Sequence, residues 1–110
     1  MIEDALRSLV ERFNRKVDRT PAMKEELAGI SRSIALRLSN GASYTIDLRD
    51  SHLTGLRSGA NGSADVTIST DALTFEGLLA KEIGPMKALV TRKLTIEGSL
   101  EDKLLFRKLL

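Results

Sequence analysis

The chain has 110 residues, of which 42% are hydrophobic and 29% charged, a composition that argues against intrinsic disorder. It contains no cysteine and one histidine, which excludes disulfides, thiolate metal sites, a cysteine nucleophile and histidine-rich metal centres. The net charge of +2 is too small for the dense basic footprint of a nucleic-acid-binding domain. We expect one domain over residues 1–110, in the cytoplasm, with no metal and no cofactor.

The N-terminal third predicts two helices and the start of a sheet. Apolar residues from Ile2 to Val17 recur at the spacing of one helix face, with charged residues between them. Thr20-Pro21 suits the start of a second, short helix, which Gly29 ends. Residues 30–38 then alternate between apolar and polar side chains, which indicates a strand.

A hairpin and two further strands follow. Asn40-Gly41 is a strong hairpin signal, because both turn residues tolerate a positive φ. The returning strand runs from Tyr44 to Leu48, and residues 52–57 predict a third, weaker strand. After a loop over residues 58–63, Val66 and Ile68 mark a fourth strand.

The C-terminal third predicts two helices, a strand and a last helix. Thr70 or Asp71 can cap a helix whose apolar side extends to Ile83, and a short helix starts at Pro85. Residues 93–97 predict the fifth strand.

The last helix opens with a capping-box pattern, Ser99 to Asp102. Its apolar stripe is wider than its short length needs. Plain core packing explains such a stripe, and a lid over an apolar cavity is the functional alternative.

The alternation of the strands indicates a sheet with one dry face and one wet face. We therefore predict an α+β fold, with a five-stranded, antiparallel-rich sheet and helices packed on one face.

No set of residues predicts catalysis. Asp50-Ser51-His52 contains the residue types of a nucleophilic triad, but strand neighbours point to opposite faces and cannot form a relay. We interpret them as a turn followed by an edge histidine, with His52 as a single ligand contact the alternative. Asp47 lies on the polar side of its strand, where we expect it to be solvated, and Asp65 suits a loop cap.

Binding of phosphate or nucleic acid is equally unsupported. The glycines at 55, 59 and 62 do not match a phosphate-binding loop. The chain has four aromatic residues and no tryptophan, too few for a stacking surface, so no nucleic-acid partner is expected.

Several segments in order resemble the sterol carrier protein type 2 domain. They include Ala-Asp-Val ahead of the fourth strand and a Leu-x-Ile-x-Gly strand leading into the last helix, and they span Ala64–Thr70, Phe75–Leu79, Gly84–Ala88 and Lys93–Leu100. The N-terminal helix, the hairpin and the order of elements are also similar, so the resemblance covers the whole chain. The family often has glycine where this chain has Lys81 and Arg92, and asparagine where it has Gly84.

This resemblance implies an apolar tunnel between sheet and helices that holds fatty acyl chains, acyl-CoA, phospholipids or sterols, with no catalytic set. We therefore predict a lipid-binding domain that is not an enzyme, and leave open whether it transfers lipid. A protein interaction or dimerisation module, with the same fold and a filled cavity, is the alternative. A lipid-presenting partner of a catalytic chain is a third interpretation.

The predicted lining residues are the inward apolar positions of the strands and helices, many of which could equally be core. They are Ile34, Leu36, Phe75, Leu78, Leu79, Ile83, Met86, Leu89, Val90, Leu94, Ile96, Leu104, Leu105 and Leu109. Lys81, Lys87 and Arg92 are predicted contacts for an anionic head group or membrane surface.

Overall fold

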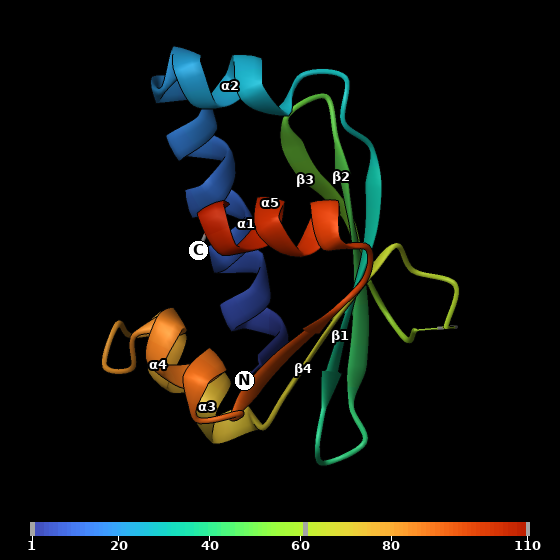
Figure 1. The fold of residues 1–110 in the computed structure, drawn as a ribbon, viewed down its shortest axis with the longest axis vertical. Coiled ribbons are helices and arrows are strands. Elements are labelled where there is room, and N and C mark those ends of the chain that lie inside the picture. The colour runs from blue at the N-terminus through green and yellow to red at the C-terminus, as the bar shows by residue number, and fades with distance from the viewer. Residues whose placement is uncertain (1, 61, 110) are drawn as a thin grey trace.

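The computed structural model describes residues 2–60 and 62–109, with side chains up to residue 105. Helices cover one face of a single sheet, and a loop lies on the other face (Figure 1). The elements in chain order are α1 (Ile2–Arg19), α2 (Pro21–Leu27), β1 (Arg32–Leu38), β2 (Ser43–Arg49), β3 (His52–Ser58), β4 (Val66–Thr70), α3 (Ala72–Leu79), α4 (Pro85–Val90), β5 (Leu94–Glu97) and α5 (Leu100–Leu109).

The sheet has five strands in the order β3-β2-β1-β4-β5. The pairs β1–β2, β2–β3 and β4–β5 are antiparallel, whereas β1 and β4 are parallel. Between β3 and β4, residues 59–60 and 62–65 lie on the side of the sheet opposite the helices (Figure 1). The predicted α+β fold, with an antiparallel-rich sheet and helices on one face, is confirmed. The tunnel stays a prediction.

The dry face of the sheet follows from the alternation of its residues. Ile34 pairs with Ile46 and with Val66, so three apolar side chains share one side of three neighbouring strands. Helix α1 meets this face with Leu6 and Val17, which lie about three turns apart and are fully buried. Two core clusters result, one around Val17, Leu27, Ile34, Leu48 and Val66, the other around Leu6, Leu36, Leu38 and Ile46.

The outer face is polar but only partly solvated. Thr45 is buried, and its hydroxyl donates to the carbonyl of Gly59, 2.6 Å away. Asp47 forms an ion pair of 3.0 Å with Arg57 on β3, and 17% of its side chain is exposed. The expectation that Asp47 is solvated was therefore wrong, because the neighbouring strand covers it.

The triad-like residues are placed as a turn and an edge histidine. Asp50 and Ser51 have φ values of 51° and 68°, which close the hairpin between β2 and β3. The Ser51 hydroxyl donates to the Lys24 carbonyl at 2.7 Å, whereas His52 Nε2 lies 2.7 Å from Asp18 Oδ1. These three side chains therefore form no relay.

Helix α1 is tied to the free edge of the sheet by one side-chain amide. Asn14 Nδ2 donates to the Leu53 carbonyl at 2.9 Å, and the Leu53 N–H donates to Asn14 Oδ1 at 2.8 Å. This pair of bonds imitates a strand neighbour, so α1 both docks on β3 and blocks pairing at that position.

Replacing Asn14 by alanine should lower the free energy of unfolding by about 2 kcal/mol, because two partly buried hydrogen bonds are lost. Urea denaturation measures this change. Lys16→Ala, at an exposed position of the same helix, is the control and should shift stability by less than about 0.5 kcal/mol. Equal stability of Asn14→Ala and the wild type would contradict this docking.

Candidate functional site

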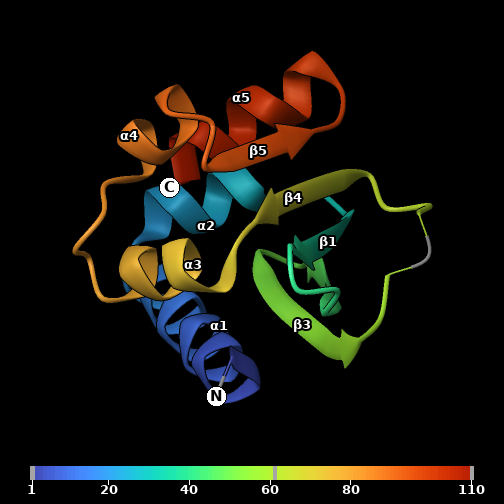
Figure 2. The same ribbon diagram turned by 90° about the horizontal axis from the view of Figure 1, so that it is seen from below.

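The predicted lining residues lie on the side of the sheet that carries β1, β4 and β5, and on α3, α4 and α5. Figure 2 shows α4, α5 and β5 along one side of the molecule, with α1 and β3 on the other. The floor of this region is apolar because Ile34 and Leu94 are buried and Ile96 pairs with Ile68 across β4 and β5.

Helix α3 begins at a well-formed cap. Asp71 accepts hydrogen bonds from both the backbone N–H and the hydroxyl of Thr74, each at 2.7 Å. The backbone bond is the main reason that the pKa of the Asp71 carboxyl is lowered, and the hydroxyl bond adds to it. The cap fixes the direction of α3, from which Phe75 packs against the second core cluster.

The turn between α3 and α4 depends on a close contact at Gly77. A Cβ at this position would lie 2.5 Å from Cδ1 of Ile83, so the absence of a side chain lets Ile83 pack against α3. The predicted extension of this helix to Ile83 was wrong. The helix ends at Leu79, and Lys81 adopts a φ of 61° just beyond it.

Helix α4 leaves two of its apolar residues exposed to solvent. Ala88 is its buried residue, whereas Met86 is 52% exposed and Val90 is 76% exposed. Leu89 is half-buried. A six-residue helix has too little surface to bury more than one side, so Met86 and Val90 form an uncovered apolar surface.

Helix α5 is held by an ion pair that the sequence did not predict. Arg32 Nε on β1 donates to Asp102 Oδ1 at 2.7 Å, and only 8% of the Asp102 side chain is exposed. The hydrogen bond to Asp102 raises the pKa of Arg32, and the nearby negative charge adds to the effect.

The predicted capping box is half formed. The Asp102 N–H donates to Ser99 Oγ at 3.1 Å, but the Asp102 carboxylate reaches Arg32 rather than the N–H of Ser99. The pattern thus marked the start of the helix correctly, while the carboxylate serves to attach the helix to the sheet.

The end of β5, which leads into α5, lies very close to the start of its neighbour β4. A Cβ on Gly98 would lie 2.9 Å from the carbonyl oxygen of Asp65, so glycine is required there. The Asp65 carboxylate in turn accepts the N–H of Ser33 at 2.8 Å, which joins the starts of β1 and β4. These contacts give a physical role to the Ala-Asp-Val and Ile-x-Gly patterns, and the expectation that Asp65 suits a loop cap agrees with its bond to Ser33.

The structure brings some predicted lining residues together and separates others. Ile34, Ile96 and Leu105 meet at the first core cluster, and Leu36 and Phe75 meet at the second. Four others, Leu78, Leu79, Ile83 and Leu89, are half-buried outside these clusters. Leu104 is 54% exposed, and the side chain of Leu109 lies outside the described residues.

Open grooves occur elsewhere on the surface. One of about 390 Å³ runs along α1 and is lined by Arg12, Arg15, Lys16, Arg19 and Thr20. A second groove of about 400 Å³ lies beside α2, and neither is lined by a predicted lining residue. Over residues 2–60 and 62–109, no cluster of acids and histidine is suited to a metal ion, and no helix could span a membrane.

The order of elements and the five-stranded sheet agree with a sequence comparison. A model of the SCP-2 sterol transfer family matches residues 10–110. The chain belongs to this family. The SCP-2 fold is associated with the binding of lipids and sterols. No curated protein sequence matches the chain.

Solved structures of sterol carrier proteins share the fold of this chain at low sequence identity. Crystalline sterol carrier protein 2 aligns with a TM-score of 0.64 and 20% identity, over 88% of this chain and 82% of that chain. The palmitated SCP2L2 of Aedes aegypti aligns with a TM-score of 0.64 and 18% identity, over 91% and 88% of the two chains.

A similar domain also occurs within an enzyme. The sec-alkylsulfatase Pisa1 from Pseudomonas sp. aligns with a TM-score of 0.60 and 21% identity over 79% of this chain. This chain spans only 14% of the length of that enzyme.

Replacing Asp102 by asparagine should loosen α5, because the Arg32 guanidinium loses its charged partner. We expect the free energy of unfolding to fall by about 2 kcal/mol. Relative to the wild type, deuterium exchange of the α5 amides should accelerate more than that of the α1 amides. Urea denaturation and hydrogen-exchange mass spectrometry measure both effects.

Glu101→Gln is the matched control, because it removes the same charge from the adjacent, exposed position of the helix. It should leave α5 exchange nearly unchanged. If Asp102→Asn and Glu101→Gln behave alike, the ion pair does not hold the helix.

Proposed function

We propose that this SCP-2 domain binds a lipid with a long acyl chain without covalent chemistry, in the space between α5 and the strands β1, β4 and β5. The observation that carries the proposal is the exposed apolar surface of α5. Leu100 and Leu104 are each more than half exposed in a family associated with lipids. A lipid that enters beside α5 would cover them.

The attachment of α5 supports its role as a lid. The helix meets the sheet side through the ion pair between Arg32 and Asp102 and through the half-buried Leu105. Beneath it lie Ile34 and Ile96, both apolar. A small outward movement of α5 would open a path between these residues at the cost of few contacts.

The energy of acyl-chain burial is sufficient without any catalytic group. Each buried methylene contributes roughly 0.8 kcal/mol, so a palmitoyl chain could contribute on the order of 10 kcal/mol before the entropy of binding is subtracted. A few polar groups at the opening would be enough to orient the head group.

The same exposed residues support a second candidate function. Leu100 and Leu104 lie one turn apart on α5, and such a stripe can also pack against a partner helix or a second copy of the chain. The domain would then be an interaction or dimerisation module. Transfer of lipid between membranes, lipid presentation to an enzyme and a cytoplasmic location stay predictions.

Native mass spectrometry of the gently purified protein distinguishes the two functions. We expect a monomer that retains lipid, and a Tm that rises with added palmitate, because a ligand at about one hundred times its Kd stabilises the folded state by roughly 2.7 kcal/mol. A lipid-free dimer would favour the interaction module. A lipid-free monomer whose Tm does not change with added palmitate would contradict the lipid-binding function.

A further inference from the structure

Two cationic residues occupy backbone positions that disfavour them. Lys81 has a φ of 61° and Arg92 a φ of 60°, each directly after the C-cap residue of its helix, Ala80 for α3 and Thr91 for α4. A left-handed residue at this position is usually glycine, because any Cβ is strained there. The strain suggests that these two side chains have a use that compensates for it.

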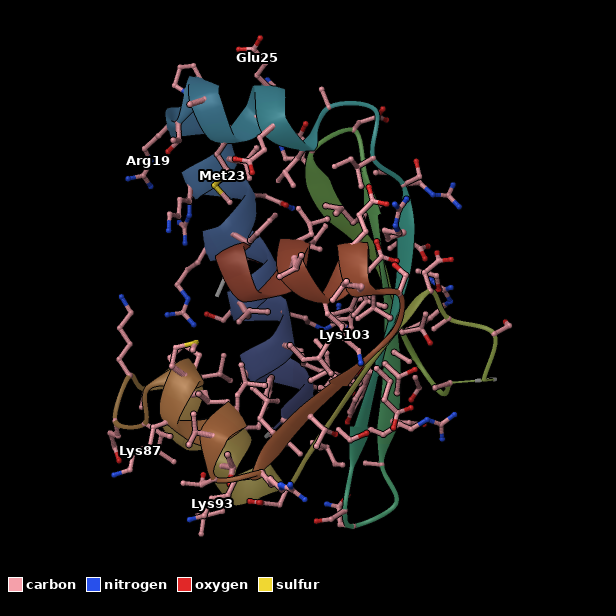
Figure 3. All side chains as sticks on the ribbon, in the orientation of Figure 1. Arg19, Met23, Glu25, Lys87, Lys93 and Lys103 are labelled. Atoms are coloured by element: carbon pink, nitrogen blue, oxygen red, sulfur yellow. The ribbon has the colours of Figure 1, made fainter. Side chains whose placement is uncertain are left out.

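Lys81 lies in the turn before α4 and Arg92 follows its C-cap residue, so positive charge flanks the exposed apolar residues of α4 at this corner of the molecule. Residues 80–93 contain four cations and a single acid, Glu82. Lys87 lies on α4 itself, and Lys93 follows the helix (Figure 3). Within the part of the chain that the structure describes, Lys81, Lys87 and Arg92 are exposed and have no ion-pair partner.

We propose that this corner, defined here as Lys81, Met86, Lys87, Val90 and Arg92, docks the protein on an anionic bilayer surface. The three cations would meet lipid phosphates, and the two exposed apolar residues would enter the interface between head groups and acyl chains. Surface-binding protein segments combine these two features, since charge attracts them to the bilayer and apolar area retains them.

The basic groove on α1 is the competing surface, and it lacks one of the two features. Arg12, Arg15, Lys16 and Arg19 supply charge, and Arg19 projects away from the sheet (Figure 3). However, the exposed large apolar residues of the described chain lie on α3, α4 and α5, and none lies on α1. The corner also adjoins the helices over the proposed lipid site, so lipid would have a short path between bilayer and protein.

A purely structural explanation of the two cations has a different consequence. Positive charge near the C-terminal end of a helix interacts favourably with the helix dipole, which could justify Lys81 and Arg92 without any partner. Replacing both residues by glycine relieves the strain and removes the charge. The stability and the membrane binding of this variant therefore distinguish the docking explanation from the purely structural one. If docking is their use, stability and membrane binding should change in opposite directions.

The test is the double variant Lys81→Gly/Arg92→Gly, assayed by cosedimentation with vesicles of phosphatidylglycerol and phosphatidylcholine. We expect its Tm to rise by about 4 °C per site and its partition onto these vesicles to fall roughly ten-fold. The variant Arg15→Gln/Arg19→Gln removes the same net charge from α1 and should lower partition by less than about two-fold. Vesicles of phosphatidylcholine alone should bind each protein weakly.

The variant Lys81→Asn/Arg92→Asn provides a second measurement should the glycine variant not fold, because asparagine is neutral and tolerates a left-handed backbone. It should lose vesicle binding to the same extent. Met86→Ser should also weaken binding, without changing the charge.

Three results would overturn the proposal. The wild-type protein does not bind anionic vesicles, the glycine and asparagine variants bind them as the wild type does, or the α1 variant loses as much vesicle binding as the glycine variant. A fall in Tm of the glycine variant would overturn the argument from strain. The proposed docking surface depends on the proposed lipid function only for the reason why the protein would dock. The vesicle assay itself requires no lipid bound inside the protein. Lipid retained in native mass spectra without vesicle binding would leave that function intact and reject the surface.

Discussion

The position of α5 depends on one close approach between two backbones. Gly98 passes so near the carbonyl of Asp65 that no side chain fits, and the Asp65 carboxylate holds the N–H of Ser33. The starts of β1 and β4 and the end of β5 therefore meet at one point. From this point α5 begins over the dry face of the sheet, where Asp102 forms an ion pair with Arg32.

That junction makes the two halves of the helical layer unlike each other. Helix α1 is bound firmly, with Leu6 and Val17 fully buried and Asn14 bonded to the edge strand. Helices α4 and α5 are bound lightly and leave much of their apolar surface uncovered. A firmly packed side thus lies next to a loosely packed side, and the loosely packed side is where we propose that lipid binds.

Local patterns in the sequence predicted the parts of the fold that depend on local physics. Asn40-Gly41, Asp71 and the Ser99–Asp102 pattern each marked a turn or a helix start, because turn and cap preferences act over a few residues. The alternation of β1 and β2 predicted the dry face of the sheet, although Ala35 and Thr45 on the opposite face are buried as well. The parallel pairing of β1 with β4, and the ion pair of Arg32 with Asp102, join residues far apart in the chain and left no local signal.

The candidate site was predictable only in part, for the same reason. Periodicity identified Met86, Val90 and Leu104 as one apolar set, but it cannot say whether another element covers them, and none of the described ones does. The end of α3 was misplaced because the chain turns left-handed at Lys81, a residue type that gives no turn signal. Glycine at that position would have revealed it.

The central claim is that an acyl chain lies between α5 and the strands β1, β4 and β5. Intermolecular nuclear Overhauser effects between palmitate methylenes and isotope-labelled isoleucine methyl groups test it most directly. The account predicts contacts to Ile34, Ile68 and Ile96, which lie on the strands on this side of the sheet. Contacts confined to Ile2 and Ile46, or none at saturating palmitate, would contradict it.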